Sequence, residues 1–378
     1  MSFRKTIFAT AALSLAALAS AGMARAADLP VKAKKPVADL PFFLVIDDRV
    51  TFSYQFTATD PGAFTLKPGG GAFNGDTAKQ VYSFTHFDVW GYGTNFFTIN
   101  MFKSDHNDPA SPCGGATPTS TENTALFGGG NSYCAGATEF YGLFRSTFGW
   151  NELFGTKAFS MGPLHNISFE IGADIEAENT IFGPAKRDGV LGLQFAFDLP
   201  YKGFFNVAPL AYKEINRNAF TTCTALSGAG FTNCNPDGNV EFNWTWAVEV
   251  NYYMDLGFLP ENFQFFSISG RAGWYGPKGN DTGSNVPPGA PGITSTATKT
   301  ELNSKPIRLT FDASKAIWGP KYTHFVDVWV AYRYWQNKFG LDHNAELGVC
   351  NAALPNGQIV STHSCTEQSA SAGITIKF

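Results

Sequence analysis

The most regular feature of the chain is a repeated alternation of apolar and polar residues. In residues 50–57 the apolar members are Val, Phe, Tyr and Phe, and Thr, Ser, Gln and Thr lie between them. The same pattern fills residues 165–176, and from Glu241 to Asp255 it continues without a break. Because successive side chains of a strand point to opposite faces, the alternation predicts strands with one apolar and one polar face.

Strand length separates the two architectures that such strands can build. Strands of soluble β-sandwiches usually have about 5–6 residues, whereas a tilted strand that crosses a bilayer needs about 9–11. The segment from Glu241 to Asp255 is too long for most sandwiches, and its apolar face carries Trp and Tyr, which are typical of a bilayer interface. We therefore predict an all-β fold, a transmembrane antiparallel up-and-down β-barrel.

Twelve strands are predicted, and the connections between them alternate between short and long. This is the pattern of outer-membrane barrels, which have short periplasmic turns and long external loops. Since an eight-stranded barrel is filled by side chains and a 16-stranded one is open, we expect a narrow lumen within residues 49–378. The predicted strands are 49–58, 79–90, 95–103, 138–150, 164–178, 189–199, 203–216, 240–255, 263–275, 300–312, 323–336 and 366–378.

Composition and the first residues agree with a bacterial outer-membrane location. Charged residues are only 15% of the chain, and aromatic residues are equally frequent. After residue 26 no apolar run reaches the roughly 18–20 residues of a membrane-spanning helix. Residues 1–26 have a basic start, an apolar run and an Ala24-Arg25-Ala26 site. They predict a signal peptide that is cleaved on export to the periplasm.

Residues 27–48 lack a regular pattern and predict a flexible periplasmic lead-in. Lys32, Lys34 and Lys35 leave open a second interpretation, a basic tether to an anionic periplasmic partner. Loss of the three basic residues of the signal peptide would reduce 27 basic residues to 24 against 31 acidic ones, a net charge of −7. A nucleic acid polymer is therefore not an expected partner.

Six cysteines fall into three pairs, each inside one polar segment. Local pairing would close one loop at a time, and all three pairs lie in predicted long loops. We expect three local disulfides in an oxidising compartment, with free or mixed pairings as the alternative. Their spacing does not match a metal site, so no metal is predicted. The pairs are Cys113 with Cys134, Cys223 with Cys234 and Cys350 with Cys365.

The C-terminus ends in an alternating strand with a terminal aromatic residue, Phe378. This ending resembles the C-terminal signature of bacterial outer-membrane barrels. The resemblance implies recognition by the barrel-assembly machinery, and outer-membrane lipids and lipopolysaccharide as surroundings. We also expect the last strand to close against residues 50–57, since an unpaired strand edge is not tolerated in lipid.

Charged residues opposite the apolar face are expected to line the lumen. The acids of the fifth strand, Glu170, Asp174 and Glu176, would favour cations and neutral solutes and repel anions. Basic residues occupy lumen-compatible positions at Arg145, Arg271, Arg308 and Arg333. An equally acceptable interpretation is an ion-pair ladder in which these arginines neutralise the acids.

No catalytic motif supports an enzyme. The chain has neither a G-x-S-x-G nor an H-E-x-x-H sequence, and its six histidines are scattered. Paired carboxylates on one strand are common solvated features and do not by themselves indicate glycosidase chemistry. We predict no cofactor and no catalytic residue.

Residues 85–100, Thr-His-Phe-Asp-Val-Trp-Gly-Tyr-Gly-Thr-Asn-Phe-Phe-Thr-Ile-Asn, resemble a hairpin of the Tsx-like nucleoside-specific channel family. The resemblance implies a narrow outer-membrane channel for nucleosides. Substrate contacts would come from the base-stacking and hydroxyl-binding side chains of this hairpin. These are His86, Asp88, Trp90, Asn95 and Phe96. In an alternative interpretation Trp90 and Phe96 are interface aromatics, and the sequence does not decide which face of this strand points inward.

These patterns together predict a passive, solute-selective outer-membrane channel for small neutral solutes. A general small-solute porin is the leading alternative. A surface-structural or adhesin barrel is an alternative from another class.

Overall fold

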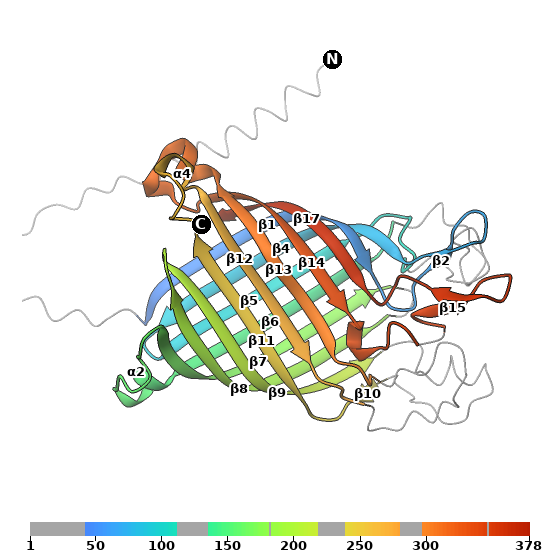
Figure 1. The fold of residues 1–378 in the computed structure, drawn as a ribbon, viewed down its shortest axis with the longest axis horizontal. Coiled ribbons are helices and arrows are strands. Elements are labelled where there is room, and N and C mark those ends of the chain that lie inside the picture. The colour runs from blue at the N-terminus through green and yellow to red at the C-terminus, as the bar shows by residue number, and fades with distance from the viewer. Residues whose placement is uncertain (1–41, 112–134, 181–182, 218–238, 280–296, 346–347) are drawn as a thin grey trace, which may run out of the picture. The chain divides into compact units, whose positions relative to one another are not determined.

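The computed structural model describes residues 42–111, 135–180, 183–217, 239–279, 297–345 and 348–378. Within these residues twelve long strands form a closed antiparallel barrel (Figure 1). Neighbours around the barrel follow the order β1, β4, β5, β6, β7, β8, β9, β11, β12, β13, β14 and β17, and β17 pairs with β1. The predicted fold class is confirmed.

The bounds of the barrel strands are close to the predicted ones. They are β1 (Phe43–Thr59), β4 (Asp76–Trp90), β5 (Gly93–Lys103), β6 (Thr138–Gly149), β7 (Leu164–Asn179), β8 (Ala185–Leu199), β9 (Gly203–Arg217), β11 (Thr245–Asp255), β12 (Phe266–Tyr275), β13 (Glu301–Asp312), β14 (Val326–Gln336) and β17 (Glu367–Lys377). Short strands are β2 (Thr65–Leu66), β3 (Phe73–Asn74), β10 (Asn239–Glu241), β15 (Asn351–Ala353) and β16 (Ile359–Ser361). Helical turns are α2 (Trp150–Phe154), η3 (Glu261–Phe263), α4 (Ala313–Trp318), η4 (Pro320–Tyr322) and η5 (Lys338–Gly340).

The first strand is longer than predicted. β1 begins at Phe43, inside the segment expected to be a lead-in, because residues 45–48 pair with residues 86–89 of β4. Residues 27–41 of the expected lead-in and the expected signal peptide lie outside the described residues. At its other side β1 pairs through Arg49–Gln55 with β17, which is the closure predicted for the last strand.

The eighth predicted strand is divided, and the expected unbroken alternation from Glu241 to Asp255 is wrong. It consists of β10 and β11, separated by residues 242–244. Phe242 turns inward, is 4% exposed, and its N–H donates to the Glu214 carbonyl outside the strand ladder. The break reverses the faces, so Glu241 points outward beside Ile215 while Glu249 points inward.

The two ends of the barrel differ as the loop lengths predicted. The short connections, α2 and α4 lie at one end with the C-terminus, which we call the short-turn end (Figure 1). The described parts of the long connections, among them β2, β10 and β15, lie at the other, which we call the long-loop end (Figure 1). There the predicted pair Cys350–Cys365 forms a disulfide, with Cα atoms 5.3 Å apart. The cysteines at 113, 134, 223 and 234 lie outside the described residues.

The outer surface of the barrel is apolar and its inner face is polar. Large apolar side chains are exposed along every flank of the barrel, for example Phe52, Ile99, Phe140, Ile175 and Leu191. Much of what is buried is polar or charged. No helix among the described residues is both long and apolar enough to cross a bilayer.

Candidate functional site

The lumen holds the predicted acids of β7. Glu170 and Asp174 are buried on the inner face, whereas Ile171 and Ala173 are exposed on the outer face. Glu176 lies two residues further along the inner face and is half-buried. The alternation of β7 therefore directs all three acids toward the lumen.

One cation joins the acids of the lumen. Arg145 of β6 donates from Nη1 to Asp174 at 2.6 Å, and from Nε and Nη2 to the two carboxylate oxygens of Glu249 at 2.9 and 2.6 Å. Glu170 lies 3.9 Å from Nε. Three strands separate β6 from β11, which carries Glu249, so this ion pair crosses the lumen. We call these four residues the Arg145 bridge.

The bridge requires glycine at position 172. Gly172 lies directly opposite Arg145 in the β6–β7 ladder. A Cβ atom there would lie 2.5 Å from Cδ of Arg145 and 2.5 Å from the Phe144 carbonyl oxygen. The absence of a side chain at Gly172 thus leaves the space that the stem of Arg145 occupies.

Of the four arginines that the sequence placed in the lumen, Arg145 pairs with the β7 acids and the other three do not. Arg333 instead forms an ion pair with Glu367, with Nε 3.2 Å from Oε1. Arg271 and Arg308 form no ion pair among the described residues. The expected ladder is therefore present in part, with Arg145 as its cation.

A group of unpaired cations lies on the inner face of β12 and β13. Arg271 and Lys305 are directly opposite each other in the ladder, and Arg308 follows on β13. Within the part of the chain that the structure describes, none of the three has a carboxylate within 4.0 Å. We call Arg271, Lys305 and Arg308 the cationic strip.

A β-bulge brings the last two members of the strip to one face. Side chains three residues apart on a regular strand point to opposite faces. Around Pro306 the pairing with β14 jumps from Ser304 to Ile307, and the pairing with β12 is also shifted. Proline has no N–H to give to a ladder, and it is tolerated at bulges. The alternation along the sequence did not indicate Lys305 as a lumen residue, although Pro306 within a predicted strand is a signal for the bulge beside it.

The Arg308 guanidinium lies over an aromatic ring of the barrel wall. Its central carbon lies 4.2 Å from the ring centre of Trp329, and its Nη2 donates to Thr375 Oγ1 at 3.3 Å. The indole N–H of Trp329 donates to the same hydroxyl at 3.0 Å. A Cβ at Gly373 would lie 2.5 Å from the indole, so glycine permits this arrangement.

Comparisons with known proteins find similar barrels. No family model matches the chain. No curated protein matches it either. Among solved structures, an outer membrane channel from Pseudomonas putida F1 is 9% identical, with 91% of this chain and 100% of that chain covered and a TM-score of 0.40. The outer membrane channel DcaP of Acinetobacter baumannii is 9% identical, with 88% and 96% covered and a TM-score of 0.31.

Four of the five hairpin residues nominated from the sequence lie on the outer face. Register pairs share a face, and His86 and Asp88 of β4 alternate with Phe87, which is opposite Phe96 on the inner face. By the same register Trp90 and Asn95 point outward, and Phe96 alone points into the lumen beside Arg145. The expectation that this hairpin lines the pore is thus corrected for His86, Asp88, Trp90 and Asn95.

The outward polar residues of this hairpin form hydrogen bonds with one another and with neighbouring side chains. Asp48 contacts His86 Nδ1 at 2.6 Å, and His86 Nε2 contacts Asp88 at 3.0 Å. Asn95 donates to Asp88 at 2.9 Å and accepts from Ser146 at 2.6 Å. Trp90 lies among other aromatic rings, stacked on Phe42 and edge-on to Tyr92 and Phe148. This is the interface-aromatic alternative for Trp90, at the short-turn end of the barrel.

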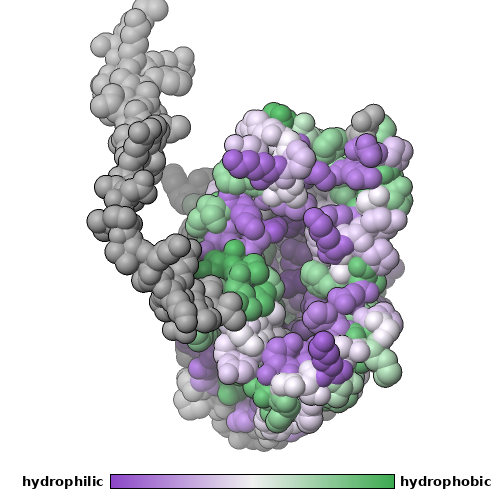
Figure 2. Space-filling model, turned by 90° about the vertical axis from the view of Figure 1, so that its left-hand side faces the viewer, coloured by the Kyte–Doolittle hydropathy of each residue, from purple (hydrophilic) through white to green (hydrophobic). Residues whose placement is uncertain are grey.

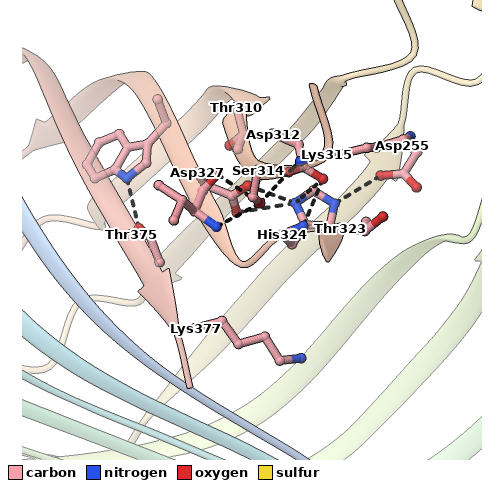
Figure 3. Close-up of polar contacts among 12 residues, drawn as sticks. Asp255, Thr310, Asp312, Ser314, Lys315, Thr323, His324, Asp327, Thr375 and Lys377 are labelled. Atoms are coloured by element: carbon pink, nitrogen blue, oxygen red, sulfur yellow. Dashed lines mark hydrogen bonds and ion pairs between the residues drawn. The ribbon is translucent and has the colours of Figure 1, made fainter. Parts of the chain in front are cut away.

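A histidine with three nearby carboxylates lies at the short-turn end (Figure 3). His324 Nδ1 lies 2.9 Å from Asp327 and 3.8 Å from Asp312, and Nε2 lies 3.6 Å from Asp255. Asp312 also caps α4 by accepting from the Lys315 N–H at 2.8 Å. The cluster therefore ties β11, α4 and β14 together.

Two groups of side chains have ligand atoms close enough for a metal ion. Asp312, His324 and Asp327 form one, and Asp60, Asp108 and Glu139 form the other. In the second group the Lys79 ammonium pairs with both Asp60 and Glu139. The Lys79 ammonium thus supplies the positive charge that a metal ion would otherwise provide to these acids. In the first group His324 is hydrogen-bonded to Asp327, so a proton on the imidazole can supply the positive charge in place of a metal ion.

The His324 cluster predicts a pH-dependent stability of the short-turn end. Burial alone would lower the pKa of His324, but the hydrogen bond to Asp327 and the charges of Asp327, Asp312 and Asp255 outweigh it and raise this pKa above the ordinary 6.5. A group whose pKa is raised in the folded state contributes its full stabilisation at pH values below its unfolded-state pKa. This stabilisation is lost as pH rises through the folded-state pKa. On going from mildly acidic to alkaline pH, we expect the free energy of unfolding of the wild type to fall by about 1–3 kcal/mol relative to that of His324→Gln, measured by denaturant unfolding. A constant difference between the two proteins over this range would contradict the prediction.

Proposed function

We propose that the protein is a passive channel of the bacterial outer membrane for small hydrophilic solutes. The observation that carries the proposal is the inverted distribution of side chains in a closed barrel, apolar outside and charged inside. Such a surface is stable in a bilayer, where a closed barrel also satisfies every strand edge. Residues 1–26 would direct export to the periplasm, and Phe378 would be read during barrel assembly.

The lumen supports passage of solutes rather than a merely structural barrel. At the short-turn end the surface is hollowed near its centre, and both hydrophilic and hydrophobic residues border the recess (Figure 2). The Arg145 bridge joins strands that lie four positions apart among the twelve strands of the barrel. It therefore narrows the lumen without closing its whole cross-section. A narrow polar lumen selects solutes through the chemistry of its wall.

Nucleosides are a narrower possibility that the geometry supports only through Phe96. The other four residues of the nominated hairpin point outward and cannot stack on a base in the lumen. We therefore propose small hydrophilic solutes as a class, and treat nucleosides as one member of it to be tested.

Reconstitution tests the proposal. The mature chain, refolded in detergent, should produce stepwise conductance in planar bilayers, and liposomes that contain it should swell in small sugars. Nucleosides and sugars of similar size, compared side by side, separate a nucleoside-selective channel from a general porin. Correctly folded barrels that give neither conductance nor swelling would exclude a channel and favour the structural or adhesin alternative.

A further inference from the structure

We propose that the cationic strip of Arg271, Lys305 and Arg308 is an anion-binding site in the lumen that selects small solutes bearing a carboxylate or phosphate group. This inference rests on the proposed channel function and names its solute class. It replaces the expectation, drawn from the β7 acids, that the lumen favours cations. Neutral solutes are then not the preferred cargo.

The strip is a concentration of like charge that the fold itself does not balance. Arg271 and Lys305 are direct cross-strand partners, and like charges in this position destabilise a sheet. Arg308 joins them only because the bulge at Pro306 turns it to the same face. Positive charges kept together against this repulsion in a confined lumen create a field that an anion from solution can satisfy.

The acids nearest the strip are already bound to other cations. Glu249 lies on the strand beside Arg271. Its carboxylate accepts from Nε and Nη2 of Arg145, and it also accepts from the Tyr275 hydroxyl at 3.0 Å. Glu367 accepts from Lys338 at 2.7 Å and pairs with Arg333. At the short-turn end Asp327 is held by His324. None of these acids forms an ion pair with the strip, and Arg145 offsets part of the negative charge of the acids around it.

The Arg308 side chain is prepared for an oxyanion. The indole of Trp329 covers one face of its guanidinium, and hydroxyls of Thr310 and Thr375 accept from Nε and Nη2 at 3.2 and 3.3 Å. Among the described residues its Nη1 has no acceptor. A planar guanidinium that is already oriented donates to carboxylate or phosphate at a smaller loss of side-chain entropy than a freely rotating one.

Ion selectivity across a KCl gradient tests the proposal. The wild-type zero-current potential should show preference for chloride over potassium. The triple variant Arg271→Gln, Lys305→Gln, Arg308→Gln should lower the chloride-to-potassium permeability ratio by about fivefold or more. The matched control is Arg187→Gln, which removes a charge from an exposed outer-face position of β8 and should leave the ratio unchanged. If the triple variant does not fold, Lys305→Gln alone, which relieves a repulsion, should shift the ratio in the same direction.

A binding measurement separates this inference from the channel proposal. Inorganic phosphate and succinate, each added to folded protein, should raise the thermal unfolding midpoint of wild type and not that of the triple variant. A response to phosphate alone or to succinate alone would identify which oxyanion the site accepts. Conductance that prefers potassium in wild type, without stabilisation by either anion, would overturn the site and leave the channel. Stabilisation by an anion without any conductance would overturn the channel and leave the site.

Discussion

Arg145→Met should destabilise the barrel by about 3–5 kcal/mol, because removal of one partner leaves buried charges without compensation. Asp174 and Glu249 would lose their ion pairs of 2.6 Å, and Glu170 its nearest cation. The substitution also removes the connection across the lumen. We therefore expect a larger single-channel conductance and a shift toward cation preference, measured together with denaturant unfolding in detergent.

The control for Arg145→Met is Arg187→Met, at an exposed position of the outer face. This variant should unfold like wild type within about 0.5 kcal/mol, as expected for a surface substitution. Gly172→Ala provides a second route to the same site, since its Cβ would displace Arg145 while all four charges remain. Unchanged stability and unchanged conductance in Arg145→Met would show that the bridge neither supports nor narrows the lumen.

Glu367→Gln should destabilise the long-loop end of the barrel by a comparable amount, about 3–5 kcal/mol. Glu367 is 1% exposed and accepts from Lys338 and Gln55, each at 2.7 Å, and from the Thr59 N–H at 3.2 Å. It also pairs with Arg333. The neutral amide would leave two buried cations without a counter-charge, and denaturant unfolding should register the loss.

Glu241→Gln is the matched control for this substitution. Glu241 belongs to β10, its side chain is 51% exposed, and it makes one ion pair, to Lys213 at 2.9 Å. Exposed pairs of this kind contribute about 0–1 kcal/mol. Equal losses in Glu367→Gln and Glu241→Gln would mean that burial of Glu367 does not govern the strength of its contacts.

Sequence patterns could place the strands because the information for a strand is local. The alternation in β7 identifies its inner face correctly at Glu170 and Asp174, and the terminal strand pairs with β1 as expected. Where both faces carry apolar residues, as in β4, alternation has no preferred phase. The inward-pointing side of that strand followed only from its register with β5 and β6.

The sequence by itself determined the number, length and order of the strands, the division into short and long connections, and one disulfide. Tertiary structure decided the charge partners. Arg145 and Glu249 are 104 residues apart, and no periodicity connects such positions. It also decided the phase changes at residues 242–244 and at Pro306, because one inserted residue exchanges the two faces of every residue beyond it. The sign of the charge left unpaired in the lumen depends on those contacts, so it follows from the closed barrel and not from the list of charges along the chain.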